Sequence, residues 1–226
     1  MIRIIPILHS INFKNKRCVS ILFDRNLLKM KIKEFLSLLN PLKGIIQKNQ
    51  KIQNTDQLIV FIKERSAWIT QVTLLGYLKT RMGTQYVKAF ENKELMQSIN
   101  YGKEKIYLTA IQDLTLFAIS YMKSNDLTDL SEEAESIHSK VIDESTNLPL
   151  SQSELFKDIE KFEKKLCTVN WIDFYKNNPF DESCKALFKW APIADELKQY
   201  DEEIVLNSMA LKWNNVVSDF KKLISF

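Results

Sequence analysis

The chain has 226 residues and a formal net charge of +4; 45% of its residues are hydrophobic and 27% are charged. These values are ordinary for a globular protein with a substantial core. Its 4 glycines and 5 prolines are too few for the many tight turns of a β-sandwich or barrel. The composition therefore predicts an all-α fold, in the form of a single helical bundle.

The N-terminal part of the chain is strongly basic. Residues 1–54 contain eleven Lys or Arg and two acidic residues, a local charge of +9 that leaves −5 for the remainder. Such an arm suits RNA, a membrane surface or an acidic partner. A nucleic-acid partner is not expected, because no aromatic-rich RNA-binding pattern accompanies the charge.

The first 29 residues contain two apolar runs, both shorter than the roughly 20 residues that span a bilayer. Their order does not match a secretory signal. We expect residues 1–29 to be a basic leader, either a transit peptide or, as we favour, a segment upstream of a true start at Met30. Residues 30–226 are then the helical domain, with no membrane span.

The cysteines Cys18, Cys167 and Cys184 are odd in number and lack C-x-x-C spacing. This pattern argues against a disulfide framework and against a thiolate zinc site. We expect a reducing compartment, the cytoplasm, and a core position for Cys167, which ends an apolar helix face.

Hydrophobic periodicity predicts the first helices. They cover residues 31–50, 56–82, 92–123 and 129–143. The helix over 56–82 is apolar on two faces, so we expect it at the centre of the bundle. Within this helix Gly76 is expected to admit a neighbouring helix, and Gly83 stands where a C-cap belongs.

The C-terminal half begins after a polar segment, residues 144–153, which is the best candidate for a sub-boundary. Ser151 and Glu154 have the spacing of a capping box and open a fifth helix. The stretch 171–192 is expected to hold short helices. A last helix, 202–223, has inward positions at three- and four-residue steps: Leu206, Met209, Trp213, Val216, Phe220 and Leu223. We expect the helices over 56–82 and 92–123 to form a central antiparallel hairpin, closed by a C-terminal helical layer.

Two charged residues stand on otherwise apolar helix stripes, Arg65 and Asp113. A buried charge is costly unless it is paired. In an antiparallel hairpin Arg65 comes within one helical turn of Asp113, so the structural interpretation is a buried ion pair. The functional interpretation is a polar cavity that holds a small ligand.

A polar–aromatic cluster lies at the predicted turn and contains Tyr77, Lys79, Arg81 and Tyr86. Its basic groups either cap the negative end of a helix dipole or bind an anion or carboxylate. The predicted binding residues are therefore Arg81, Tyr77, Lys79, Tyr86, Arg65, Asn100 and Asp113.

One histidine has metal-ligand spacing, in Glu135-x-x-His138, with Glu132 one turn earlier. A di-metal bundle needs a second such pair, and the other histidine is His9 in the leader. We therefore expect a solvated charged helix, with no metal and no other cofactor. No phosphate loop, dinucleotide fingerprint or G-x-S-x-G elbow is present in the sequence.

Three stretches of the sequence resemble a family of uncharacterised alphaproteobacterial proteins, some of which are labelled "esterase". They are Glu64–Arg65–Ser66–Ala67–Trp68, Gly76–Tyr77–Leu78–Lys79–Thr80–Arg81–Met82–Gly83–Thr84, and Ser98–Ile99–Asn100 with Asp113–Leu114. The resemblance covers residues 60–123. It implies a bacterial cytoplasmic protein whose motif lies around Arg81, and it transfers no mechanism.

Three functions stay open at this point. The first, which we favour, is a helical binding or assembly module that receives a protein partner at the Arg81 turn or the Trp213 seam. The second is a small-ester hydrolase, without a recognisable catalytic motif. The third is a ligand-binding helical bundle with a polar cavity around Arg65 and Asp113.

Overall fold

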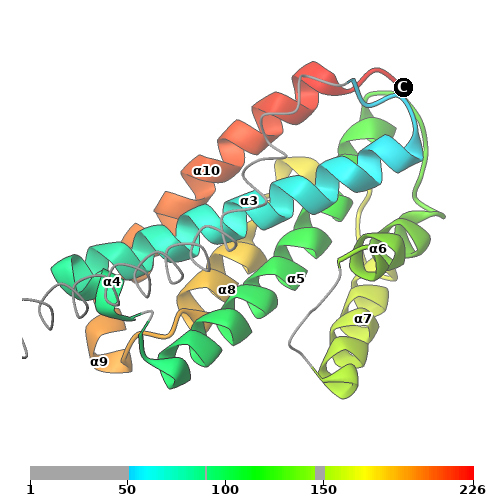
Figure 1. Cartoon of the computed structure of the whole chain (residues 1–226). Helices are drawn as coiled ribbons and strands as arrows, with labels where there is room; N and C mark the ends of the chain where they lie inside the picture. The colour runs from blue at the N-terminus through cyan, green and yellow to red at the C-terminus, as the bar shows by residue number, and fades with distance from the viewer. Residues whose placement is uncertain (1–50, 90, 146–150) are drawn as a thin grey trace, which may run out of the picture. The chain divides into compact units, whose positions relative to one another are not determined.

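The computed structural model describes residues 51–89, 91–145 and 151–226. The leader over 1–29, the helix predicted over 31–50, Cys18 and His9 lie outside the described residues, as does most of the boundary predicted over 144–153. The described helices are α3 (Thr55–Met82), η1 (Gly83–Gln85), α4 (Tyr86–Ala89), α5 (Lys93–Ser124), α6 (Ala134–Asp143), α7 (Gln152–Leu166), η2 (Phe174–Lys176), α8 (Asp181–Trp190), α9 (Asp195–Lys198) and α10 (Glu202–Leu223). The predicted all-α fold is confirmed (Figure 1).

The predicted hairpin is formed by α3 and α5, which pack along each other. Each helix begins with an asparagine cap: Asn54 accepts from the backbone N–H of Gln57, and Asn92 accepts from Glu94 and Leu95. Gly83 ends α3 with a φ of 52°, in the left-handed region that favours glycine, and its N–H donates to the Lys79 carbonyl. The Gly83 cap is thus confirmed.

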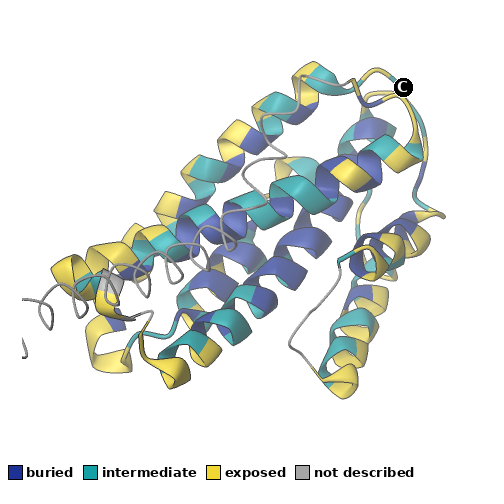
Figure 2. Cartoon of the chain, in the orientation of Figure 1, coloured by how far each residue is buried: buried dark blue, intermediate teal, exposed yellow. Residues whose placement is uncertain are grey.

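Both helices of the predicted hairpin pack against several neighbours, and α5 is the more deeply buried of the two. Between Ile106 and Met122 all but two positions of α5 are buried, and α5 packs on α3, α6, α8 and η2. Figure 2 shows this stretch as a nearly continuous buried segment. The reason lies in the charges, because Asp113 is the single charged residue of that stretch, whereas α3 carries charged side chains in its middle turns.

The C-terminal layer consists of α8 and α10, which contact each other and the hairpin. The Trp213 ring of α10 stacks on Phe180, with centroids 4.1 Å apart. The predicted inward seam is confirmed at its four middle positions, which are buried: Met209, Trp213, Val216 and Phe220.

One glycine lets two helices approach closely, and it is Gly102. A Cβ at Gly102 would lie 2.3 Å from the Trp190 carbonyl oxygen of α8, whereas a Cβ at Gly76 would meet nothing within 4 Å. The expectation for Gly76 was wrong because that position of α3 faces solvent.

The helix α7 lies at the edge of the described bundle (Figure 1). Its capping box is confirmed: the Ser151 hydroxyl accepts from the Glu154 N–H, and the Glu154 carboxylate accepts from the Ser151 N–H. Cys167 is exposed, contrary to its predicted core position, because Phe162 is the one buried residue of α7. No helix among the described residues has the length and hydropathy needed to cross a membrane.

Candidate functional site

The predicted Arg81 cluster forms an internal contact, which we call the Asp201 contact. The Arg81 guanidinium donates from Nε and Nη2 to the two carboxylate oxygens of Asp201, and Nη2 also donates to the Leu197 carbonyl at 2.8 Å. The Tyr77 hydroxyl donates to Asp201 Oδ2 at 2.8 Å. These bonds hold the end of α3 against the start of α10.

The pKa values of Asp201 and Tyr77 reflect the hydrogen bonds that the Asp201 carboxylate accepts. Hydrogen bonding by Arg81 lowers the pKa of Asp201, while burial and the Asp201 carboxylate raise the pKa of Tyr77 to about 12. Of the other two predicted members, Lys79 is exposed and Tyr86 packs half-buried against the core. The guanidinium that was expected to receive an anion is thus already bound to a carboxylate of its own chain.

The predicted pair between Arg65 and Asp113 does not form. Arg65 Nη2 lies 3.2 Å from Asp219 Oδ2 on α10, and the guanidinium lies over the Phe61 ring at 5.6 Å from its centroid. Arg65 faces α10, whereas Asp113 faces α7 and α8. Asn100, half-buried near the start of α5, joins neither contact.

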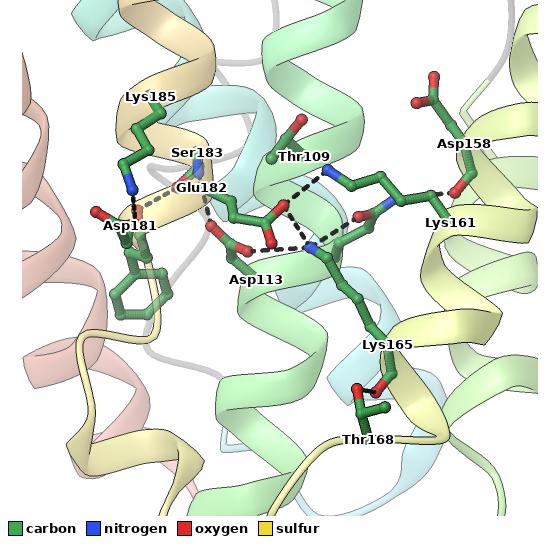
Figure 3. Close-up of polar contacts among 12 residues, drawn as sticks. Thr109, Asp113, Asp158, Lys161, Lys165, Thr168, Asp181, Glu182, Ser183 and Lys185 are labelled. Atoms are coloured by element: carbon green, nitrogen blue, oxygen red, sulfur yellow. Dashed lines mark hydrogen bonds and ion pairs between the residues drawn. The ribbon is translucent and has the colours of Figure 1, made fainter.

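Asp113 instead caps a helix that is distant in sequence. It is 2% exposed, and its Oδ2 accepts a hydrogen bond of 2.8 Å from the backbone N–H of Ser183, in the first turn of α8 (Figure 3). The Phe180 N-cap residue of α8 makes no side-chain cap. Asp113 therefore supplies from α5 the acceptor that α8 lacks locally, at the positive end of the helix dipole.

A lysine of α7 completes this contact, which we call the Asp113 contact. Lys165 Nζ lies 2.8 Å from Glu182 Oε2 and 3.9 Å from Asp113 Oδ1, and it donates to Gln112 Oε1 at 3.2 Å. Figure 3 shows the Lys165 side chain reaching between the two carboxylates. Lys161 also pairs with Glu182, at 2.8 Å. The ammonium of Lys165 is therefore shared, and its closest ion pair is with Glu182 rather than Asp113.

The Asp113 contact lies in the wall of an open cleft of about 500 Å³, which we call the Asp113 cleft. The cleft is lined by Asp113, Leu116, Lys165, Thr168, Val169, Asn170, Phe174, Asn177, Asn178, Pro179, Asp181 and Glu182. Three carboxylates and one ammonium are among these side chains. Sites of this volume hold small molecules.

Burial raises the pKa of Asp113 to about 7, although the Lys165 ammonium and the Ser183 N–H both favour the ionised form. A carboxyl group that titrates near neutral pH in a cleft is a functional-site candidate. Burial of the carboxylate outweighs the hydrogen bonds from the Ser183 backbone and side chain and the charge of Lys165, whose Nζ lies 3.9 Å from Oδ1, beyond hydrogen-bond distance. A donor placed beside Oδ1 would stabilise the carboxylate.

The metal interpretation depended on His138. This side chain is 1% exposed, stacks on Phe162 with ring centroids 3.9 Å apart, and has no hydrogen-bond partner on either ring nitrogen among the described residues. Burial, followed by the charge of Lys165, lowers its pKa to about 3. His138 is thus buried and not solvated as expected, and no group of three potential metal ligands occurs among the described residues.

Sequence reasoning found one member of the Asp113 contact and missed Lys165 and Glu182. Asp113 stands out because it interrupts an apolar stripe. Lys165 does not, because it is one of several lysines on a charged amphipathic helix. Glu182 was hidden in a stretch for which the sequence predicted short helices without assigning their faces.

Comparison of the chain with protein-family models, with curated proteins and with solved structures finds no match. The resemblance over residues 60–123 therefore stays a prediction, and the function is inferred from the geometry of the site.

Proposed function

We propose that the helical domain binds a small organic cation, a primary amine, in the Asp113 cleft. The observation that carries the proposal is the buried Asp113 carboxylate in the wall of the cleft, whose Oδ2 caps α8 and whose Oδ1 lies 3.9 Å from an ammonium that is bound more closely by Glu182. A buried carboxylate is costly unless donors or charges satisfy it. An ammonium group supplies both the charge and the hydrogen bond.

The charge of the cleft favours a cation over an anion. Asp113, Asp181 and Glu182 line it together with the single cation Lys165. Lys165 is held by Glu182 at 2.8 Å and by the Gln112 side-chain oxygen Oε1 at 3.2 Å, so an anionic ligand would have to displace these partners. A cationic ligand would instead pair with Asp113, which lies further from the Lys165 ammonium than Glu182 does.

The rest of the lining favours a ligand with a second polar group. Asn170, Asn177 and Asn178 contribute amide groups to the cleft, and Leu116 and Phe174 contribute apolar surface. Asn178 is held at a φ of 50°, a left-handed conformation that asparagine tolerates better than most residues. An amine that also carries a hydroxyl or carbonyl group fits this lining.

The protein-partner function predicted from the sequence depended on two surfaces that are used within the chain. Arg81 is bound by Asp201, and Trp213 is buried against Phe180. A partner would have to use another surface, which is considered in the next subsection.

The test compares three probes of equal length and different charge: 3-amino-1-propanol, 1,3-propanediol and 3-hydroxypropionate. Thermal unfolding of the full chain is measured with each probe at matched ionic strength. A ligand present at ten times its Kd stabilises the native state by about 1.4 kcal/mol, roughly 3 to 6 °C in Tm for a domain of this size. We expect this shift with the amine alone, and a larger shift at pH 8 than at pH 6 because ionised Asp113 is the binding form.

Two variants serve as matched controls. Asp113→Asn is expected to abolish the shift, because the neutral amide offers no charge to the ammonium. Asp201→Asn removes a carboxylate outside the cleft and is expected to retain it. Equal shifts with all three probes, stabilisation by the anionic probe, or a shift that survives in Asp113→Asn would each refute the proposal.

A further inference from the structure

The outward face of α10 has features that the cleft does not explain. Ile204 and Leu211 are 70% and 66% exposed and lie seven residues, two helical turns, apart. Tyr200 and Leu197, just before α10, are also exposed. Figure 2 shows exposed positions along the outer side of this helix. Single exposed apolar residues are ordinary, so the argument depends on what surrounds them.

The fully exposed positions between Ile204 and Ser218 carry no charge, and the one charged residue of this stretch, Lys212, is partly buried. The exposed positions are Ile204, Asn207, Ser208, Leu211, Asn214, Asn215 and Ser218. The exposed side of α7 in the same bundle is different, because it is mostly charged: Lys157, Glu160, Lys161, Glu163 and Lys164. An uncharged face costs less free energy to desolvate than a charged one, and its short side chains let another helix approach closely.

The charges of α10 are gathered at its two ends. The exposed charges of the first turn are acidic, Glu202 and Glu203, and those of the last turn are basic, Lys221 and Lys222. Glu203 and Lys221 are eighteen residues apart, which is five helical turns, so they lie in line along the helix. Leu211 lies close to the midpoint between them.

We propose that this face of α10 pairs in an antiparallel orientation with the same face of a second copy of the chain. A two-fold axis near Leu211 brings the two Leu211 side chains together and sets Glu203 of each copy beside Lys221 of the other. A parallel pairing would instead set acid against acid and base against base. The acidic first turn and the basic last turn of α10 complement each other only in an antiparallel pair. This arrangement favours a second copy of the chain as the partner of this face.

The surroundings of the paired charges agree with this arrangement. Glu203 has no ion-pair partner among the described residues. The Lys221 ammonium lies over the Tyr121 ring, 5.3 Å from its centroid, which leaves its hydrogen-bond donors available. Because each copy contributes one helix, the interface is smaller than the roughly 1,200 Å² of a stable complex. We therefore expect a weak dimer, populated at protein concentrations on the order of 100 µM.

The test is sedimentation equilibrium of the full chain over a concentration series, with circular dichroism to establish that each variant is folded. Wild-type protein is expected to dimerise, and Leu211→Lys to weaken the dimer at least tenfold. Glu203→Lys and Lys221→Glu are each expected to weaken it, because each homodimer sets like charges together. Their equimolar mixture is expected to regain wild-type affinity, since both charge pairs of the mixed dimer are opposite in sign.

Three outcomes would overturn the proposal. A monomer at all concentrations would mean that another occupant, such as the basic segment 1–50, covers this face or that nothing does. A dimer unaffected by Leu211→Lys would use another surface. A dimer in which the mixed charge variants do not recover would have a different register, and a mixture that dimerises more tightly than wild type would indicate a parallel pair. Because the cleft and this face share no residue, amine binding is tested independently of dimerisation.

Discussion

Two carboxylates of the bundle, Asp201 and Asp113, each join helices that are distant in sequence. Their pKa values are shifted in opposite directions. Asp201 accepts from the Arg81 guanidinium and the Tyr77 hydroxyl, and its pKa is lowered. Asp113 accepts one backbone N–H, stands 3.9 Å from a shared ammonium, and its pKa is raised to about 7. Burial is the largest cause of the shift at Asp113, whereas hydrogen bonding by Arg81 is the largest cause at Asp201.

The comparison separates a closed structural contact from a candidate site. In the Asp201 contact, which the sequence nominated for ligand binding, the Arg81 guanidinium binds a carboxylate of the same chain. In the Asp113 contact, a buried carboxylate with a raised pKa lies in the wall of a cleft, 3.9 Å from an ammonium that it shares with Glu182. An incompletely satisfied buried charge is therefore the better indicator of a site than a cluster of basic and aromatic residues.

The largest effect is expected for Asp113→Ala, which removes the acceptor of the Ser183 N–H and leaves a cavity beside Lys165. We expect the free energy of unfolding to fall by about 3 kcal/mol in urea denaturation at pH 7. Asp113→Asn keeps an acceptor oxygen and is expected to lose less than half as much. Equal losses in the two variants would mean that charge, and not capping, dominates at this position.

The close approach of α5 and the end of α8 depends on Gly102. In Gly102→Ala the added methyl group would lie 2.3 Å from the Trp190 carbonyl oxygen, so the helices must separate. A loss of about 2 kcal/mol in the free energy of unfolding is expected. An unchanged stability would show that α8 can shift without cost.

The two carboxylates should also respond to pH in opposite directions. Because the folded-state pKa of Asp113 lies above its ordinary 3.8, the folded protein holds a proton there between about pH 4 and 7, and the stabilisation is lost as pH rises through about 7. Wild-type stability relative to Asp113→Asn should therefore fall between about pH 4 and 7 and level off at higher pH. His138 titrates in both proteins, so its contribution cancels. A difference that is independent of pH would contradict the raised pKa.

A smaller effect is expected at the Asp201 contact, which lies at the end of the bundle. Arg81→Met should lower stability at pH 7, by less than Asp113→Ala, because solvent can replace part of the lost hydrogen bonding. Its deficit should shrink on acidification below about pH 4, where Asp201 takes up a proton and the wild-type pair weakens. A deficit that grows in acid would mean that Arg81 acts through packing.

The smallest effect, of opposite sign, is expected for Gly76→Ala on the exposed side of α3. No atom obstructs the new methyl group, and alanine is the better helix former by about 1 kcal/mol. Thermal unfolding should show a slightly higher Tm. A lower Tm would show that the position is more crowded than the geometry indicates.

Several helices and two of the helix ends could be predicted from the sequence alone. The three- and four-residue steps of apolar side chains predicted α3, α5 and α10, Gly83 marked a helix end, and Ser151 with Glu154 marked a start. These features depend on residues within about four positions of one another. The charge of Asp113 within an apolar stripe was also visible, because it violates a local pattern.

The partners of these residues were decided by the tertiary structure. Arg65 meets Asp219 instead of Asp113, Arg81 meets Asp201, and Lys165 reaches Asp113 from 52 residues further along the chain. Such contacts depend on how each helix is rotated and crossed against its neighbours, which the periodicity of one helix does not encode. For the same reason the sequence assigned the close approach to Gly76, and only the packing of α5 against α8 assigned it to Gly102.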